Sequence, residues 1–241
     1  MKASVSDQRS ILDIQKFDQQ STTLKNKAAT LPEFAEISST TIKQNNVRDL
    51  RIAAETELSD VKRELARAEG DVEQIVTRIE RDEKRLASGT GTPKELEQTQ
   101  HELGTLGVRR SELEEVELEI MMRVDGIKDR ISALTLEENE LALVIADLNI
   151  RKENALAAIY TELEGIETDR KATTQSVGAE LLTLYEKILQ SSGIGAAALA
   201  GNQCKGCNLT MNTIELQRIS GLAEDEVVRC EECRCILVRD K

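Results

Sequence analysis

The residues of this sequence best suited to chemistry are its five cysteines, which all lie near the C-terminal end. They are Cys204, Cys207, Cys230, Cys233 and Cys235, within the segment CKGCNLTMNTIELQRISGLAEDEVVRCEECRC. The first four form two C-x-x-C pairs, and each pair can turn so that both sulfurs point at one place. Two such pairs supply the four thiolates of tetrahedral Zn²⁺, with Zn–S distances of about 2.3 Å. The spacing therefore predicts one structural zinc ion per chain, held by these four cysteines, with no position left for a reactive water.

Other uses of the cysteines stay open at this point. A redox-active pair normally follows a strand in a βαβ unit, and neither C-x-x-C has that context. Four thiolates alone do not distinguish zinc from an iron–sulfur cluster. Cys235 lies two residues beyond Cys233, so a Cys233/Cys235 pairing is also an alternative. The C-x-x-C spacing favours Cys233 as the ligand and leaves Cys235 as a spare, at least half-buried thiol on the following strand.

The sequence around the cysteines predicts a small domain over residues 191–241. About 40 residues bury too little apolar surface to fold alone, and zinc coordination adds folding free energy directly. The stretches GAAALA, EVVRC and CILVR are typical of short strands. NTIELQRIS between them is typical of a short helix with Asn212 or Thr213 as its N-cap. We therefore expect a zinc ribbon with a helical insert.

Residues 1–190 carry two apolar series with the spacing of a coiled coil. The first consists of Leu58, Val61, Leu65, Ala68, Val72, Ile75, Ile79 and Leu86. The second consists of Leu106, Leu113, Ile120, Val124, Ile127, Ile131, Leu134, Leu141, Ile145, Leu148, Ala155 and Ile159. Steps of three, four or seven place each series on one face of a helix. The fold class is therefore predicted to be mainly α, a long antiparallel coiled-coil hairpin followed by the ribbon.

The hairpin tip is predicted at residues 88–94, within SGTGTPKEL. Thr92 with Glu95 three residues later forms a capping box, and Pro93 suits the first helical position. The second long helix is expected to run from Pro93 to about Gln190. A shorter helix over about residues 6–29 is expected before Pro32, with Ile11, Ile14, Phe17 and Leu24 folding back on the root of the hairpin.

Composition and charge argue against several classes of protein. Four aromatic residues, no Trp and 32% charged residues make a compact enzyme fold unexpected. No apolar run is long enough for a membrane span or a signal peptide, so we expect a cytoplasmic protein without a membrane partner. The net charge of −12 is concentrated in residues 95–190, which hold 21 Asp and Glu against 10 Lys and Arg. A surface that coats DNA would instead cluster its cations.

No set of residues suggests catalysis, and a cofactor beyond zinc is not expected. His101 is the single histidine and is interpreted as a solvated helix residue near the tip. The cations available for nucleic acid in the ribbon are Lys205, Arg218, Arg229, Arg234 and Arg239. Residues 191–241 contain no aromatic side chain to stack on bases, and four thiolates with Zn²⁺ add negative charge.

The sequence resembles the bacterial zinc-ribbon coiled-coil proteins over nearly its whole length. The matching stretches are ILDIQKFDQQ, LPEFAEI, GTPKELEQTQHELGTLGVRRSELEEVELEIM, LLTLYEKIL, CKGC and CEECRCILVR, and the last is the most specific. In that family a glycine and then an arginine commonly follow the fourth cysteine, where this chain has Arg234 and Cys235. The left-handed turn that glycine tolerates must therefore be made by Arg234 or avoided.

The resemblance implies two kinds of function. Members of the family are regarded as adaptor or nucleic-acid-binding proteins, and some resemble chaperone-like partners of transcription and secretion components. The favoured hypothesis is a non-enzymatic adaptor whose hairpin binds proteins, because long exposed helices are good docking surfaces. The alternative is a regulator that binds RNA or DNA through the ribbon.

Overall fold

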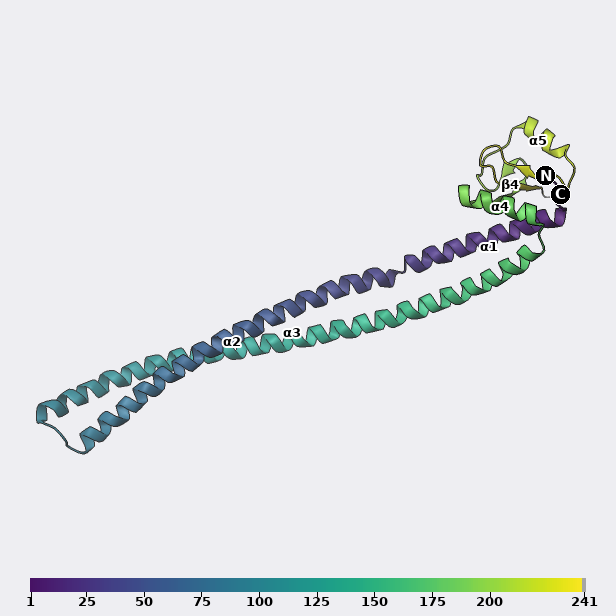
Figure 1. The fold of residues 1–241 in the computed structure, drawn as a ribbon. Coiled ribbons are helices and arrows are strands. Elements are labelled where there is room, and N and C mark those ends of the chain that lie inside the picture. The colour runs from purple at the N-terminus through teal and green to yellow at the C-terminus, as the bar shows by residue number, and fades with distance from the viewer. Residues whose placement is uncertain (240–241) are drawn as a thin grey trace. The chain divides into compact units, whose positions relative to one another are not determined.

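The structure is a computed structural model and describes residues 1–239. Its helices are α1 (Val5–Ala29), α2 (Pro32–Ala87), α3 (Pro93–Gln175), α4 (Ala179–Ser192) and α5 (Thr213–Ser220). Its strands are β1 (Ala196–Ala200), β2 (Gln203–Cys204), β3 (Val228–Arg229) and β4 (Ile236–Arg239). The predicted mainly α class, with long hairpin helices before a small sheet, is confirmed (Figure 1).

The chain forms two compact units. The hairpin unit comprises Ala35–Asn149, and the ribbon unit combines Met1–Phe34 with Ile150–Lys241. This grouping differs from a division of the chain at residue 190, because α1 and the C-terminal part of α3 pack with the ribbon rather than with the hairpin tip.

In the hairpin unit, α2 and α3 lie side by side and antiparallel (Figure 1). The centre of their seam consists of Ala54, Val61 and Ala68 from α2 against Ile120, Val124 and Ile127 from α3, all buried. These residues belong to the two series expected from heptad spacing, apart from Ala54, which extends the α2 series toward the N-terminus. A two-helix coil has one apolar seam, so the outer face of each helix meets solvent.

Charged pairs between the two helices flank this seam. Glu138 on α3 accepts hydrogen bonds from Arg51 at 2.8 Å and Arg48 at 3.1 Å on α2. These two bonds hold the pKa of the Glu138 carboxyl below its usual value. Further pairs join Arg123 to Glu64 and Arg130 to Glu57.

The tip between α2 and α3 has the predicted geometry. The Thr92 N–H donates to Oε2 of Glu95 at 2.7 Å, and the Glu95 N–H donates to Oγ1 of Thr92 at 3.4 Å. This reciprocal capping box starts α3 at Pro93. Gly89 and Gly91 both adopt positive φ values, which end α2 and reverse the chain.

The expectation of one helix from Pro93 to about Gln190 is wrong, because α3 ends at Gln175 and α4 begins at Ala179. Gly178 is the N-cap of α4 and has no side chain to cap it. Its N–H donates instead to Oδ2 of Asp7 on α1, at 3.2 Å. Val177 beside it is buried in the core of the ribbon unit. Contacts with α1 therefore accompany a break that the heptad pattern does not reveal.

The ribbon unit contains a four-stranded sheet in the order β2-β1-β4-β3. The central pair, β1 and β4, is parallel, with Ala196 opposite Ile236, and both outer pairs are antiparallel. Successive side chains of a strand point to opposite faces. One face therefore packs on α1 and α4 through Ala196, Ile236 and Val238, and the other faces the cysteines through residues such as Leu237.

A polar network of buried and half-buried groups joins α1 to the elements that carry the sheet. Asp18 on α1 accepts two hydrogen bonds from Arg170 of α3, at 2.7 and 3.2 Å, and one from the Tyr185 hydroxyl of α4 at 2.7 Å. Burial and the hydrogen bond to Asp18 raise the pKa of Tyr185. One turn earlier, Oε1 of Gln15 accepts the N–H groups of Gly195 and Ala196 at 2.7 and 3.1 Å. We call these residues the Asp18 network.

Tyr185 also explains why residue 195 is a glycine. The ring of Tyr185 is fully buried, and a Cβ added at Gly195 would lie 2.4 Å from its Cε2 atom. Backbone and ring are therefore in direct contact where the chain passes from α4 into β1.

We expect Gly195→Ala to destabilise the ribbon unit by about 1–3 kcal/mol, the usual cost of overpacking a buried site. Urea unfolding followed by tyrosine fluorescence measures this, because Tyr160 and Tyr185 both belong to the ribbon unit. The matched control is Gly126→Ala in α3, where the new methyl group meets no heavy atom within 4 Å. The control should not lower stability, since alanine is the better helix former. An unchanged midpoint for Gly195→Ala would contradict the close contact.

Candidate metal centre

The first C-x-x-C forms a tight turn between β1 and α5. The Asn208 N–H donates to the carbonyl of Cys204 at 2.8 Å, and the Cys204 N–H donates to the carbonyl of Leu209 at 3.1 Å. Asn208 adopts φ 59, a left-handed conformation that Asn tolerates better than most residues. A Cβ at Gly206 would lie 3.1 Å from that of Ala197, so glycine lets this turn pack closely on β1.

The second C-x-x-C repeats the same backbone geometry. The Arg234 N–H donates to the carbonyl of Cys230 at 3.0 Å, and the Cys230 N–H donates to the carbonyl of Cys235 at 2.9 Å. Arg234 adopts φ 61, so it makes the left-handed turn expected after the fourth cysteine, where glycine would tolerate that conformation best. The second turn is as regular as the first, and Arg234 bears the conformational cost.

The two turns bring four sulfurs together. The Sγ atoms of Cys204, Cys207, Cys230 and Cys233 all lie within 4.8 Å of one another. The separations across the two turns are 3.9 Å for Cys204 to Cys233 and 3.9 Å for Cys207 to Cys230. Four sulfurs at about 2.3 Å from a single tetrahedral ion are about 3.8 Å apart. The cluster therefore has the dimensions to hold one metal ion, and it contains the four predicted ligands.

Cys235 lies directly beside this cluster. Its Sγ atom is 3.3 Å from that of Cys233 and 3.8 Å from that of Cys204, and its side chain is fully buried. It occupies the position that corresponds to Leu209 in the first turn. Burial raises the pKa of the Cys235 thiol, and burial raises the pKa of the neighbouring Cys233 thiol in the same way.

Most of the five ribbon cations proposed for nucleic acid are engaged in hydrogen bonds within the ribbon. Three of them make side-chain hydrogen bonds within the ribbon: Lys205 with Gln203, Arg218 with Glu215, and Arg229 with the Arg234 carbonyl. The fourth, Arg234, is exposed on the second turn.

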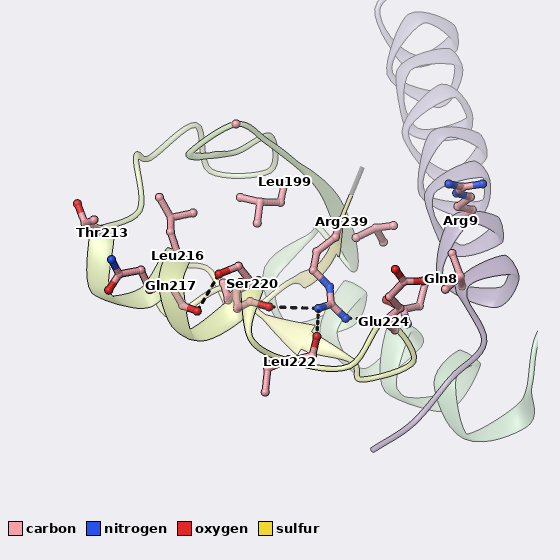
Figure 2. Close-up of a pocket in the computed structure, with 14 residues that line it drawn as sticks. Gln8, Arg9, Leu199, Thr213, Leu216, Gln217, Ser220, Leu222, Glu224 and Arg239 are labelled. Carbon is pink, nitrogen blue, oxygen red and sulfur yellow. Dashed lines mark hydrogen bonds between the residues drawn. The ribbon is translucent and has the colours of Figure 1, made fainter. Parts of the chain in front are cut away.

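Arg239 has a structural position that sequence reasoning did not identify. Its guanidinium donates to five backbone carbonyls, those of Ile219, Leu222, Ala223, Glu224 and Glu226. Figure 2 shows it pointing into the loop that follows α5. A guanidinium satisfied in this way closes the loop onto β4 and has little capacity left for a phosphate.

A cavity of about 630 Å³ lies beside Arg239 within the ribbon unit (Figure 2). Its apolar lining includes Leu199 of β1, Leu216 and Ile219 of α5, and Leu222. Gln8 and Arg9 of α1 line another side. The cavity lies over the sheet, and no cysteine lines it.

Elsewhere in the described part of the chain, the structure leaves His101 exposed on α3. The four-cysteine cluster is the one group of three or more His, Cys, Asp or Glu ligand atoms within residues 1–239 that could hold a metal ion. Over the same residues, no helix has both the length and the apolar character needed to cross a membrane.

Comparison with known proteins places this architecture in a family. Residues 14–193 match the CT398-like coiled coil hairpin domain. An uncharacterised protein of Mycobacterium tuberculosis is 35% identical over 99% of this chain and 98% of its own length. An uncharacterised protein of Mycobacterium leprae is 26% identical over 94% of this chain and 97% of its own length.

Solved structures have the same fold. A structure from Mycobacterium smegmatis is 30% identical and covers the whole of both chains with a TM-score of 0.86. The structure of CT398 from Chlamydia trachomatis is 19% identical, covers 97% of this chain and 98% of its own, and has a TM-score of 0.66. The hairpin domain matches most of the chain, and the relatives are similar to it over nearly their full length. The chain therefore belongs to the CT398-like coiled-coil hairpin family.

Proposed function

We propose that this protein is a non-enzymatic, cytoplasmic adaptor or chaperone-like protein that binds other proteins through the hairpin unit and carries a structural zinc ion in the ribbon unit. The protein-binding role of the hairpin rests on the number of large apolar side chains that the hairpin unit exposes. They are Ile42, Leu50, Ile52, Val108, Val116, Leu118, Met121, Met122, Leu136, Leu143 and Val144. Isolated exposed apolar residues are common, but many on one rod-like element favour a protein-binding role.

The choice of zinc rests on the four thiolate donors and on the short distances between their sulfur atoms. Four thiolates in tetrahedral array suit zinc or iron. A multi-iron cluster holds its cysteine sulfurs farther apart than a single ion does, whereas these four lie within 4.8 Å of one another. Between single ions, zinc is the usual occupant of closed sites with two C-x-x-C pairs. With four protein ligands, the ion would stabilise the fold and would have no open position for catalysis.

The alternative, nucleic-acid binding through the ribbon, has weaker support. Phosphate binding requires cations that are free to approach the backbone of the nucleic acid. Arg239 is held by five carbonyls and Arg218 pairs with Glu215, so Arg229 and Arg234 are the exposed arginines best placed to contact phosphates.

The metal assignment predicts different outcomes for two cysteine substitutions. Cys207→Ser should remove most of the bound zinc, because one of four thiolates is lost. Cys235→Ser should retain about one zinc per chain, since Cys235 lies beside the cluster but outside it. Elemental analysis of the purified proteins measures this. Equal loss in both variants would refute the ligand assignment.

The adaptor function is tested by capture of partners from lysate onto the immobilised full-length chain, with and without nuclease treatment. We expect the same proteins to be retained in both arms, because contacts between proteins do not need nucleic acid. The control variant, Arg229→Ala with Arg234→Ala, should capture these proteins as wild type does. Loss of capture after nuclease treatment would support the alternative. So would RNA binding at about micromolar affinity and 150 mM salt that this double variant abolishes.

A further inference from the structure

The face of α3 that lies opposite the seam has an unusual composition. Ile120, Val124 and Ile127 are buried against α2 and mark heptad positions a and d. With Val124 at position a and Ile120 and Ile127 at position d, positions b, c and f lie on the side of the helix away from α2. We consider these positions between residues 108 and 147. Every residue at these positions is exposed. We call this set the outer face of α3, and all of it belongs to the hairpin unit.

Apolar residues recur along the centre of this face. Val108, Met122, Leu136 and Leu143 share position f, and their side chains are 64%, 63%, 62% and 72% exposed. Leu118 lies beside them at position b and is 57% exposed. Position f is the most distant from the seam and is normally polar in a two-helix coil. By the same count, helix α2 has two large apolar residues on its outer face, Ile42 at position f and Ile52 at position b, against five on α3.

The charges on the outer face of α3 are all of one sign. It carries seven acidic residues and no Lys or Arg: Glu112, Glu115, Glu119, Asp125, Asp129, Glu140 and Asp147. The Lys and Arg residues of this part of α3 lie at other positions. Arg123 and Arg130 pair with Glu64 and Glu57 of α2, and Arg110 pairs with Glu114. Arg109 and Lys128 pair with two carboxylates of the outer face, Glu112 and Asp125. The corresponding face of α2 is balanced, with four acidic residues (Asp49, Asp60, Glu73, Glu80) and four basic ones (Arg63, Arg67, Arg81, Lys84).

We propose that the outer face of α3 binds a basic amphipathic helix of a partner protein. The apolar line would receive the apolar side of that helix, and the surrounding carboxylates would pair with its Lys and Arg residues. A second copy of this face would place carboxylates against carboxylates, which disfavours self-association there. Nucleic acid and anionic membranes would be repelled in the same way. This inference rests on the proposed adaptor function and specifies its surface and partner class.

The experiment places a photo-crosslinking amino acid at one position of the full-length chain in living cells. Leu136 on α3 is compared with Ile42 on α2, because both occupy position f and are 62% and 59% exposed. Crosslinked peptides are identified by mass spectrometry. We expect position 136 to crosslink about tenfold more to another protein than position 42 does. The crosslinked segment should carry net positive charge and apolar residues at helical spacing.

A second measurement uses a synthetic helical peptide of leucine and lysine with its leucines on one face. Leu136→Gln with Leu143→Gln should weaken its binding about tenfold without loss of helicity, since both side chains are exposed. Ile42→Gln with Leu50→Gln is the matched control and should bind as wild type does. Equal binding by both double variants would show that charge alone attracts the peptide and would overturn the apolar contribution.

The outcomes of the crosslinking separate the two proposals. Crosslinks from position 42 alone would leave the adaptor function standing and overturn the assignment to α3. Crosslinks from position 136 to a second copy of this chain, or to an acidic segment, would overturn the partner class. Absence of protein crosslinks from both positions would count against the adaptor function itself.

Discussion

The ribbon unit depends on a carboxylate at the N-terminal end of the chain. Asp18 receives the guanidinium of Arg170 and the hydroxyl of Tyr185, and Gln15 accepts two backbone N–H groups at the start of β1. Buried polar groups are costly unless they are paired, and every polar side-chain atom of Asp18, Gln15 and Tyr185 in this set is paired except Nε2 of Gln15. The set fixes α1, the end of α3, α4 and the first strand to one another. The sheet that carries the cysteines is thereby linked to three helices, α1, α3 and α4.

This dependence explains which features the sequence predicts and which it does not. Signals confined to a few residues are reliable: the Thr92–Glu95 capping box, the Asn212 cap of α5 and the turn within each C-x-x-C motif all form within short stretches. Heptad spacing likewise predicts the seam, because a helix repeats its faces by local geometry. In each case the residues that form the feature lie in one segment, so their types and spacing can be read directly from the sequence.

Several features that need a distant partner were not predicted. The break between α3 and α4 is accompanied by a bond from Gly178 to Asp7, and the parallel pairing of β1 with β4 joins residues far apart in the chain. Arg239 resembled a free cation in the sequence, but its five carbonyl partners come from a loop whose path is not locally encoded. Gln15 and Asp18 gave no signal, since polar residues in an amphipathic helix are normally assigned to solvent.

The two units are therefore stabilised by different interactions, and we assign them different roles. The hairpin unit is held by a continuous apolar seam and presents long exposed faces, of which that of α3 is apolar and acidic. In the ribbon unit, much of the order around the sheet comes from groups that converge on single points, the four sulfurs and the Asp18 network. In this account the hairpin unit provides the binding surface, and the metal site stabilises the ribbon unit.

Hydrogen–deuterium exchange of the full-length protein, with and without a zinc chelator, tests this account most directly. Removal of the metal should make the amides of β1, β4 and α5 exchange much faster, because four converging thiolates are no longer held together. The amides around Val61 and Val124 in the hairpin seam should keep their protection, since no metal ligand contributes to that core. Two results would contradict the account. One is loss of protection in the hairpin seam together with the sheet, and the other is a sheet that stays protected after the metal is removed.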